Sequence, residues 1–167
     1  MARLRAGEEI EARRREVWAR QQLSEDATLA GVMVDLAERG PHVVVDSCRG
    51  SRTLRIVAVG RDFCAGVDRS RWVLVALGAV ESIRSTSASL QPGGHRAHTL
   101  DVTLAEALSD LLTDRPRLTM ATTSGRLVSG ELRAVGADVV TVRTESDPPG
   151  VAHVVLDRIV EVLVATP

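Results

Sequence analysis

The stretch Gly125–Thr144, GRLVSGELRAVGADVVTVRT, constrains the fold more than any other part of this sequence. Its apolar residues alternate with polar ones on either side of a corner at residues 135–138, which predicts two half-buried strands joined by a tight turn. Gly130 lies inside the first strand, where a glycine indicates a sharp bend rather than a flat sheet. The alternating residues are Val128, Leu132 and Ala134 before the corner and Val140 and Val142 after it.

The composition limits the number of domains and the classes of partner, but it does not indicate a specific function. The 167 residues are 44% apolar, enough for one mid-sized domain or two small ones with packed cores. The formal net charge of −1 excludes a global basic field, so any contact with nucleic acid would need a local cluster of arginines. No apolar run is long enough to span a membrane, and the N-terminus is dense in charge, so we expect a cytoplasmic protein without membrane contact.

The two cysteines, Cys48 and Cys64, lack the CxxC spacing of redox or zinc sites. We therefore expect two buried, reduced thiols that act as small apolar side chains.

The first half of the chain predicts helices followed by strands. Residues 1–22 carry acid-before-base pairs at i,i+4, which favour a charged N-terminal helix. From Ser24 onward, apolar residues at i, i+3, i+4 and i+7 predict an amphipathic helix that Gly40-Pro41 ends. Five short valine-rich strands are expected next: HVVVDSC, TLRIVAV, FCAGVD, RWVLVA and AVESIR.

The pattern then starts again after a small, polar stretch at residues 85–98 that resembles a linker. Thr103 and Glu106 form a predicted capping box in front of a second amphipathic helix. Three blocks recur in the same order at a period near 75 residues, which favours an internal duplication. We therefore expect an N-terminal helix at 1–23, a first repeat at 24–84, a linker at 85–100 and a second repeat at 101–167.

Residues 125–135 resemble the second strand of the Sm-like small barrels, the fold of the Sm, LSm and Hfq families, in the pattern G-x-x-x-x-G-x-L-x-x-hydrophobic. Residues 155–162 resemble the closing strands of that family. The resemblance implies a mainly β protein with helices: two tandem, Sm-like or SH3-like five-stranded barrels, each preceded by an α-helix, plus the N-terminal charged helix.

The sequence departs from this family where the family reads RNA. The acidic and asparagine positions that follow the second strand fall near Gly136 and Val140, and near Gly60 and Cys64 in the first repeat, and the chain contains no asparagine. Recognition of single-stranded RNA needs stacking faces and hydrogen-bonding edges. We therefore expect no uridine-specific pocket.

No catalytic or metal-binding motif is present, so we expect neither an enzyme nor a bound cofactor or metal. His95 and His98 lie in the linker, which offers no rigid metal shell. Asp62 and Asp138 occupy matching corners, where Asp supports turns. Trp72 is expected in a core or an interface. The candidate residues for an interaction or RNA contact are Arg61, Asp62, Arg126, Asp138, Asp157 and Arg158.

Three classes of function remain after these exclusions. The first is a non-enzymatic interaction or scaffold protein that binds a protein partner or itself through exposed strand edges. The second is an RNA-associated protein, favoured by arginines near strand ends: Arg61, Arg126, Arg133, Arg143 and Arg158. The third is a regulatory domain that binds a small ligand. A contiguous basic face would favour RNA, whereas an apolar patch would favour a protein contact.

Overall fold

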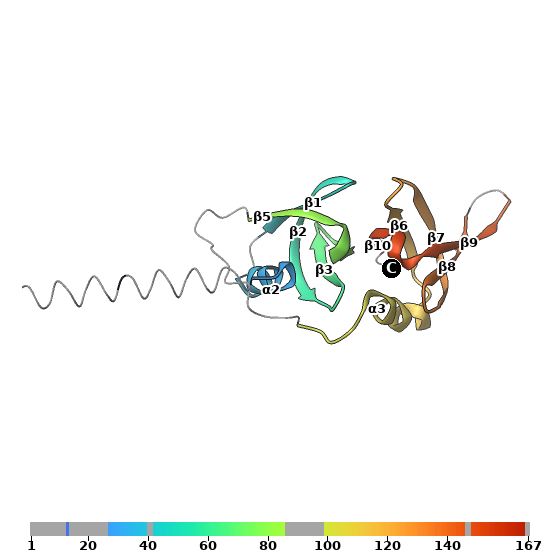
Figure 1. Ribbon diagram of the computed structural model, residues 1–167. Helices are drawn as coiled ribbons and strands as arrows, with labels where there is room; N and C mark the ends of the chain where they lie inside the picture. The colour runs from blue at the N-terminus through green and yellow to red at the C-terminus, as the bar shows by residue number, and fades with distance from the viewer. Residues whose placement is uncertain (1–12, 14–26, 40–41, 86–98, 146–147, 166–167) are drawn as a thin grey trace, which may run out of the picture.

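The computed structural model describes residue 13 and residues 27–39, 42–85, 99–145 and 148–165. Among these residues, ten strands form one continuous antiparallel sheet in the order β5-β1-β2-β3-β4-β10-β6-β7-β8-β9 (Figure 1). The expectation of two tandem five-stranded barrels is therefore wrong. Apart from residue 13, the predicted N-terminal charged helix lies outside the described residues, as do the linker histidines and most of the linker.

The elements of the first half follow the predicted positions closely, because the local apolar periodicity and the turn residues determine where each begins and ends. They are α2 (Leu29–Arg39), β1 (His42–Ser47), β2 (Gly50–Val59), β3 (Phe63–Asp68), β4 (Arg71–Ala76), a 3-10 turn (Leu77–Ala79) and β5 (Val80–Ser85).

The second half repeats this order, with the helix confirmed at the predicted capping box. The Thr103 hydroxyl accepts a hydrogen bond from the Glu106 N–H, and the Glu106 carboxylate accepts one from the Thr103 N–H. The hydrogen bonds that the Glu106 carboxylate accepts from the Thr103 N–H and from the Thr103 hydroxyl lower the pKa of Glu106. The elements are α3 (Leu104–Asp110), a 3-10 turn (Leu111–Thr113), β6 (Arg117–Thr122), β7 (Leu127–Val135), β8 (Val139–Thr144), β9 (Gly150–Val155), a 3-10 turn (Leu156–Arg158) and β10 (Ile159–Val164).

The two strand groups join where β4 pairs with β10, which lies between β4 and β6; we call this pairing the seam. Strands β3, β4 and β10 are buried over several consecutive residues because both of their faces are covered. Alternate residues of β3 and β4 enter different cores: Cys64 packs with the first half, whereas Phe63 and Leu74 pack with the second. Shared strands and shared cores are the physical reason that two separate barrels do not form.

Local irregularities bend the strands. A side chain on Gly130 would place its Cβ 2.3 Å from the Arg143 carbonyl oxygen, so the predicted bend in β7 requires glycine. A bulge between Leu132 and Ala134 then reverses the alternation. Ala134 is therefore exposed, contrary to its predicted place on the inner face, and Val135 packs against the core instead.

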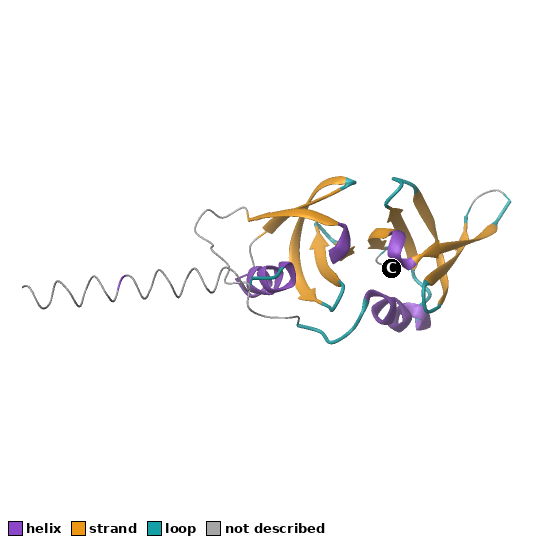
Figure 2. Cartoon of the chain, in the orientation of Figure 1, coloured by secondary structure: helices purple, strands orange, loops and turns teal. Residues whose placement is uncertain are grey.

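Figure 2 shows α2 beside the strands of the first half and α3 beside those of the second. Met33, Val34 and Leu36 bury the apolar face of α2 in the first core, and Leu104 and Leu108 bury that of α3 in the second. Within the described ranges, no helix is long and apolar enough to cross a membrane.

Candidate functional site

The two predicted aspartate corners have the same backbone construction. Asp62 accepts a hydrogen bond at its carbonyl from the Leu77 N–H at 2.8 Å, and Asp138 accepts one from the Leu156 N–H at 2.8 Å. Each corner therefore holds the 3-10 turn that precedes the last strand of its half. The Asp62 carboxylate also accepts a bond from the Leu104 N–H at 2.7 Å, which ties the first half to the start of α3.

A hollow of about 480 Å³ lies between the halves at this corner, and we call it the seam hollow. It brings together two predicted residues, Asp62 and Asp157, along with Thr103 and Thr123. Its lining contains two carboxylates and no arginine, so it disfavours an anionic ligand.

A second hollow, of about 360 Å³, brings together two other predicted residues, Arg126 and Arg158; we call it the arginine hollow. Hydroxyls of the β6–β7 turn and the imidazole of His153 complete its polar lining, and valines from β7 and β9 make the rest. Among the described residues, no carboxylate lines this hollow and neither arginine makes an ion pair. Its full lining is Thr122, Thr123, Ser124, Arg126, Val128, His153, Val154, Val155 and Arg158.

Arg61 and Asp138 line neither hollow. The Arg61 guanidinium pairs with Asp101 at 3.1 Å and approaches Glu106 at 3.6 Å, so its charge is compensated. Asp138 is exposed at its corner. The six predicted residues therefore do not form one site.

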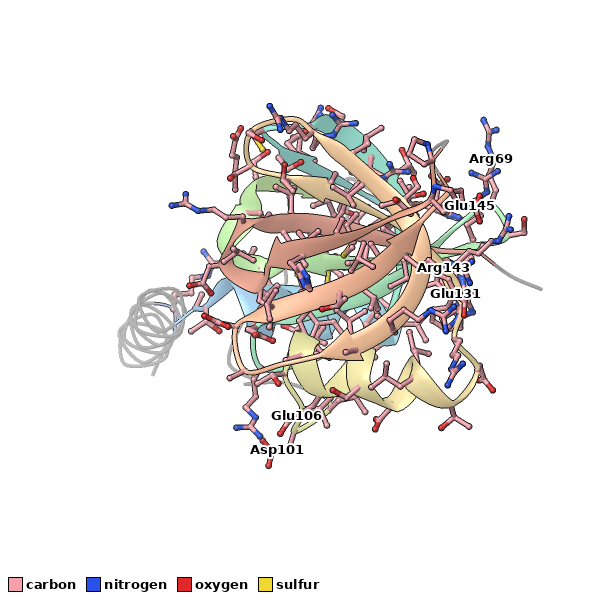
Figure 3. All side chains as sticks on the ribbon, turned by 90° about the vertical axis from the view of Figure 1, so that its right-hand side faces the viewer. Arg69, Asp101, Glu106, Glu131, Arg143 and Glu145 are labelled. Carbon is pink, nitrogen blue, oxygen red and sulfur yellow. The ribbon has the colours of Figure 1, made fainter. Side chains whose placement is uncertain are left out.

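The other predicted arginines lie among acids. Figure 3 shows Arg69, Glu145, Arg143 and Glu131 along the right-hand side of the molecule and Asp101 and Glu106 at the lower left. Arg133 pairs with Glu131 at 3.3 Å. This side of the molecule is mixed in charge and does not form the contiguous basic face expected of an RNA-binding protein.

The sequence interpretation missed an ion cluster that spans the seam. Arg52 on β2 donates two hydrogen bonds of 2.8 Å to the carboxylate of Glu161 on β10 and one of 2.8 Å to Asp68 on β3. Glu161 is only 6% exposed, and these bonds raise the pKa of Arg52. A charged residue in the middle of the apolar run IVEVLV was the available signal, because such a residue needs a partner when it is buried.

An apolar hollow of about 330 Å³ lies between β4 and α3. Trp72 and Leu100 line it, and both are 43% exposed. Trp72 is thus at a boundary between the two halves, as expected of an interface residue, and is partly open to solvent.

Within the described part of the chain, the sheet ends in β5 and β9, each of which pairs with one neighbouring strand. On β9, Val151 is 63% exposed and Val155 is 49% exposed. An exposed strand with apolar side chains presents unpaired backbone groups that favour pairing with another strand.

Cys48 is exposed, which contradicts the expectation of two buried thiols, whereas Cys64 is fully buried. Burial raises the pKa of the Cys64 thiol to about 12. In the part of the chain that the structure describes, no group of three or more His, Cys, Asp or Glu side chains could hold a metal ion. No family model, curated protein or solved structure matches this chain.

Proposed function

We propose that this chain is a non-enzymatic interaction protein that assembles with copies of itself through its two sheet edges. The observation that carries the proposal is the seam. There β4, which would otherwise be an edge strand of the first half, pairs with β10, the last strand of the second half. The recurring order of elements makes β9 the counterpart of β4 and β5 the counterpart of β10. The same pairing is therefore available between copies.

The register of the seam specifies which residues would meet. In the seam, Trp72 lies opposite Val164. When the 3-10 turns that begin at Leu77 and Leu156 are aligned, Trp72 corresponds to Val151 and Val164 corresponds to Ser85. Val151 of one copy would therefore lie opposite Ser85 of the next. Pairing would cover Val151, which is the most exposed large apolar side chain among the described residues. Such head-to-tail contacts use different surfaces on each copy and produce a ring when the rotation closes.

The resemblance to Sm-like proteins and the internal duplication are also proposals. They are supported by the matching order of elements and by matching hydrogen bonds, such as Gly60 N–H to the Phe63 carbonyl at 2.8 Å and Gly136 N–H to the Val139 carbonyl at 2.7 Å. The mixed charges around Arg143 and Arg133 favour a protein contact over an RNA contact.

Sedimentation velocity over a wide concentration range tests the assembly. We expect masses that are multiples of 17.9 kDa for the unmodified chain and a shift to the monomer for Val151→Asp, because a carboxylate would be placed in the paired edge. The control is Val57→Asp, which changes another exposed valine, 41% accessible on β2, away from both edges. A monomer at every concentration, or equal effects of the two substitutions, would refute edge pairing.

A further inference from the structure

We propose that the arginine hollow binds the phosphate group of a small phosphomonoester. Arg126 and Arg158 both line one hollow whose described lining contains no carboxylate. Guanidinium groups bind phosphate oxygens through paired N–H donors. Thr123 and Ser124 add hydroxyls at the same place, whereas the Thr122 hydroxyl donates to the Arg126 carbonyl at 3.3 Å and lies 3.0 Å from the Ser124 hydroxyl.

The backbone that carries these groups is held in place by hydrogen bonds. The Thr123 N–H donates to the Arg158 carbonyl at 2.9 Å, which joins the β6–β7 turn to the turn before β10. The Thr122 N–H donates to the Arg126 carbonyl at 2.9 Å, and the Gly125 N–H donates to the Thr122 carbonyl at 2.8 Å. Gly125 has a φ of +81°, which glycine adopts without strain. Binding would therefore require ordering of side chains more than of backbone.

The first half adds a third cation beside this turn. The Arg49 guanidinium donates a hydrogen bond of 3.0 Å to the Gly125 carbonyl, so the β1–β2 and β6–β7 turns face each other (Figure 1). Asp157, the acid next to Arg158 in the chain, lines the seam hollow instead. His153 stands at the arginine hollow with its Nδ1 3.0 Å from the Thr141 hydroxyl. The charges that the structure gathers here are thus mainly positive.

The size and charge of the hollow specify the class of ligand. A volume of about 360 Å³ exceeds what a bare oxyanion fills, and Val128, Val154 and Val155 provide an apolar surface for the rest of the ligand. Two uncompensated guanidiniums match the charge of a phosphomonoester near neutral pH, which is close to −2. A phosphodiester in an RNA strand carries one negative charge per phosphate, so it matches this pair of cations less well.

Isothermal titration of the full-length protein with UMP, AMP, uridine, inorganic phosphate and oligo(U) tests the proposal. We expect UMP and AMP to bind with similar affinity and uridine not to bind, because the phosphate supplies the recognised charge. Arg126→Gln and Arg158→Gln should each weaken UMP binding at least about tenfold, the effect of losing one charge-assisted hydrogen bond. The matched control is Arg39→Gln, an exposed arginine at the end of α2.

Thermal melting of each variant, without ligand, verifies that it is folded before its affinity is compared. Absence of UMP and AMP binding, or equal UMP affinities for the unmodified protein and both hollow variants, would overturn the proposal. Binding of oligo(U) but not UMP, lost in the same variants, would also overturn it and would assign the hollow to an RNA backbone. If inorganic phosphate binds as well as UMP, the valine surface has no role in recognition and the phosphomonoester class is wrong. His153, Val154 and Val155 of the edge strand β9 also line the hollow, so the titration with UMP is repeated on Val151→Asp. Unchanged UMP affinity in that variant would separate ligand binding from the assembly of copies.

Discussion

The two halves of the sheet bend at corresponding places but carry the required glycine on opposite strands. In the second half the glycine is Gly130 on β7, and its added Cβ would lie 2.3 Å from the Arg143 carbonyl oxygen on β8. In the first half it is Gly66 on β3, and its added Cβ would lie 3.0 Å from the Arg55 carbonyl oxygen on β2. Where two bent strands cross this closely, one of them must have a glycine at the crossing. The comparison shows that the glycine can be on either strand of the pair.

Substitution of these two glycines should give the largest loss of stability and tests the comparison directly. Gly130→Ala should lower the free energy of unfolding by about 3 kcal/mol or more, because a 2.3 Å contact with backbone forces the strands apart. Gly66→Ala should cost about 1–2 kcal/mol, because its closest approach is 3.0 Å. Urea unfolding of both variants measures the difference, and equal losses would contradict the assigned crowding.

The seam gives the next largest effect. Glu161→Ala should lower the free energy of unfolding by about 2–3 kcal/mol, because it leaves the Arg52 charge without its buried partner. The loss should be smaller than for a fully buried ion pair, because the Arg52 side chain is 29% exposed. Asp68→Ala removes the more exposed partner of the same arginine and should cost about 1 kcal/mol or less. A larger loss in Asp68→Ala than in Glu161→Ala would show that the seam carboxylate is not the main partner.

Next to the seam, Ala121 on β6 lies opposite the buried Glu161 on β10. The corresponding pair in the first half is polar and more exposed to solvent. Asp46 lies opposite Ser82, and hydrogen bonds from Arg84, Ser51 and Ser82 hold the pKa of Asp46 well below its usual range. Because the folded pKa is lowered, its contribution to stability is present above the unfolded pKa and is lost as the pH falls through the folded value.

Asp46→Asn should therefore unfold at a lower urea concentration than the unmodified protein at neutral pH. The difference between their midpoints should narrow in acid, as the carboxylate of the unmodified protein becomes protonated. Urea titrations from neutral to strongly acidic pH measure this gap, and a gap independent of pH would exclude the ionised carboxylate as its cause.

The smallest perturbation uses the two thiols of the first half as probes. Cys48 should react with a thiol reagent in the native protein, whereas Cys64 should react only after unfolding, because it is buried and its pKa is raised to about 12. In Gly130→Ala, a change in the second half, Cys64 should become reactive at lower urea, since the two cores share strands. An unchanged Cys64 midpoint in that variant would show that the halves unfold independently.

The sequence was most informative about local structure. Alternation and turn residues located the strands, the capping box located α3, and Gly130 marked a bend, because these signals act between neighbours in the chain. The β4–β10 pairing could not be predicted in this way, because the alternation of apolar residues within a strand does not specify which other strand it pairs with. Ala134 was misplaced because a single-residue bulge reverses every later position of a strand.

The candidate site was recovered only as separate residues. Arg126 and Arg158 were predicted from their places near strand ends, but their shared hollow depends on the contact between the β6–β7 turn and the turn before β10. The same holds for Asp62 and Asp157 in the seam hollow. Arg52 was not predicted, because its partners on β3 and β10 come close only when the sheet curls. The domain boundaries at residues 23, 84 and 100 stay predictions.

The seam also has a consequence for how the chain is made. Val75 pairs with Glu161, so about half of the chain separates two residues that are neighbours in the sheet. During synthesis β4 leaves the ribosome long before β10 has been made, so the edge of β4 stays unpaired until β10 emerges. Long-range pairing of this kind slows folding and exposes strand edges to aggregation. We therefore expect a nascent chain halted before residue 159 to need protection by chaperones and to become protease-resistant only after β10 has emerged.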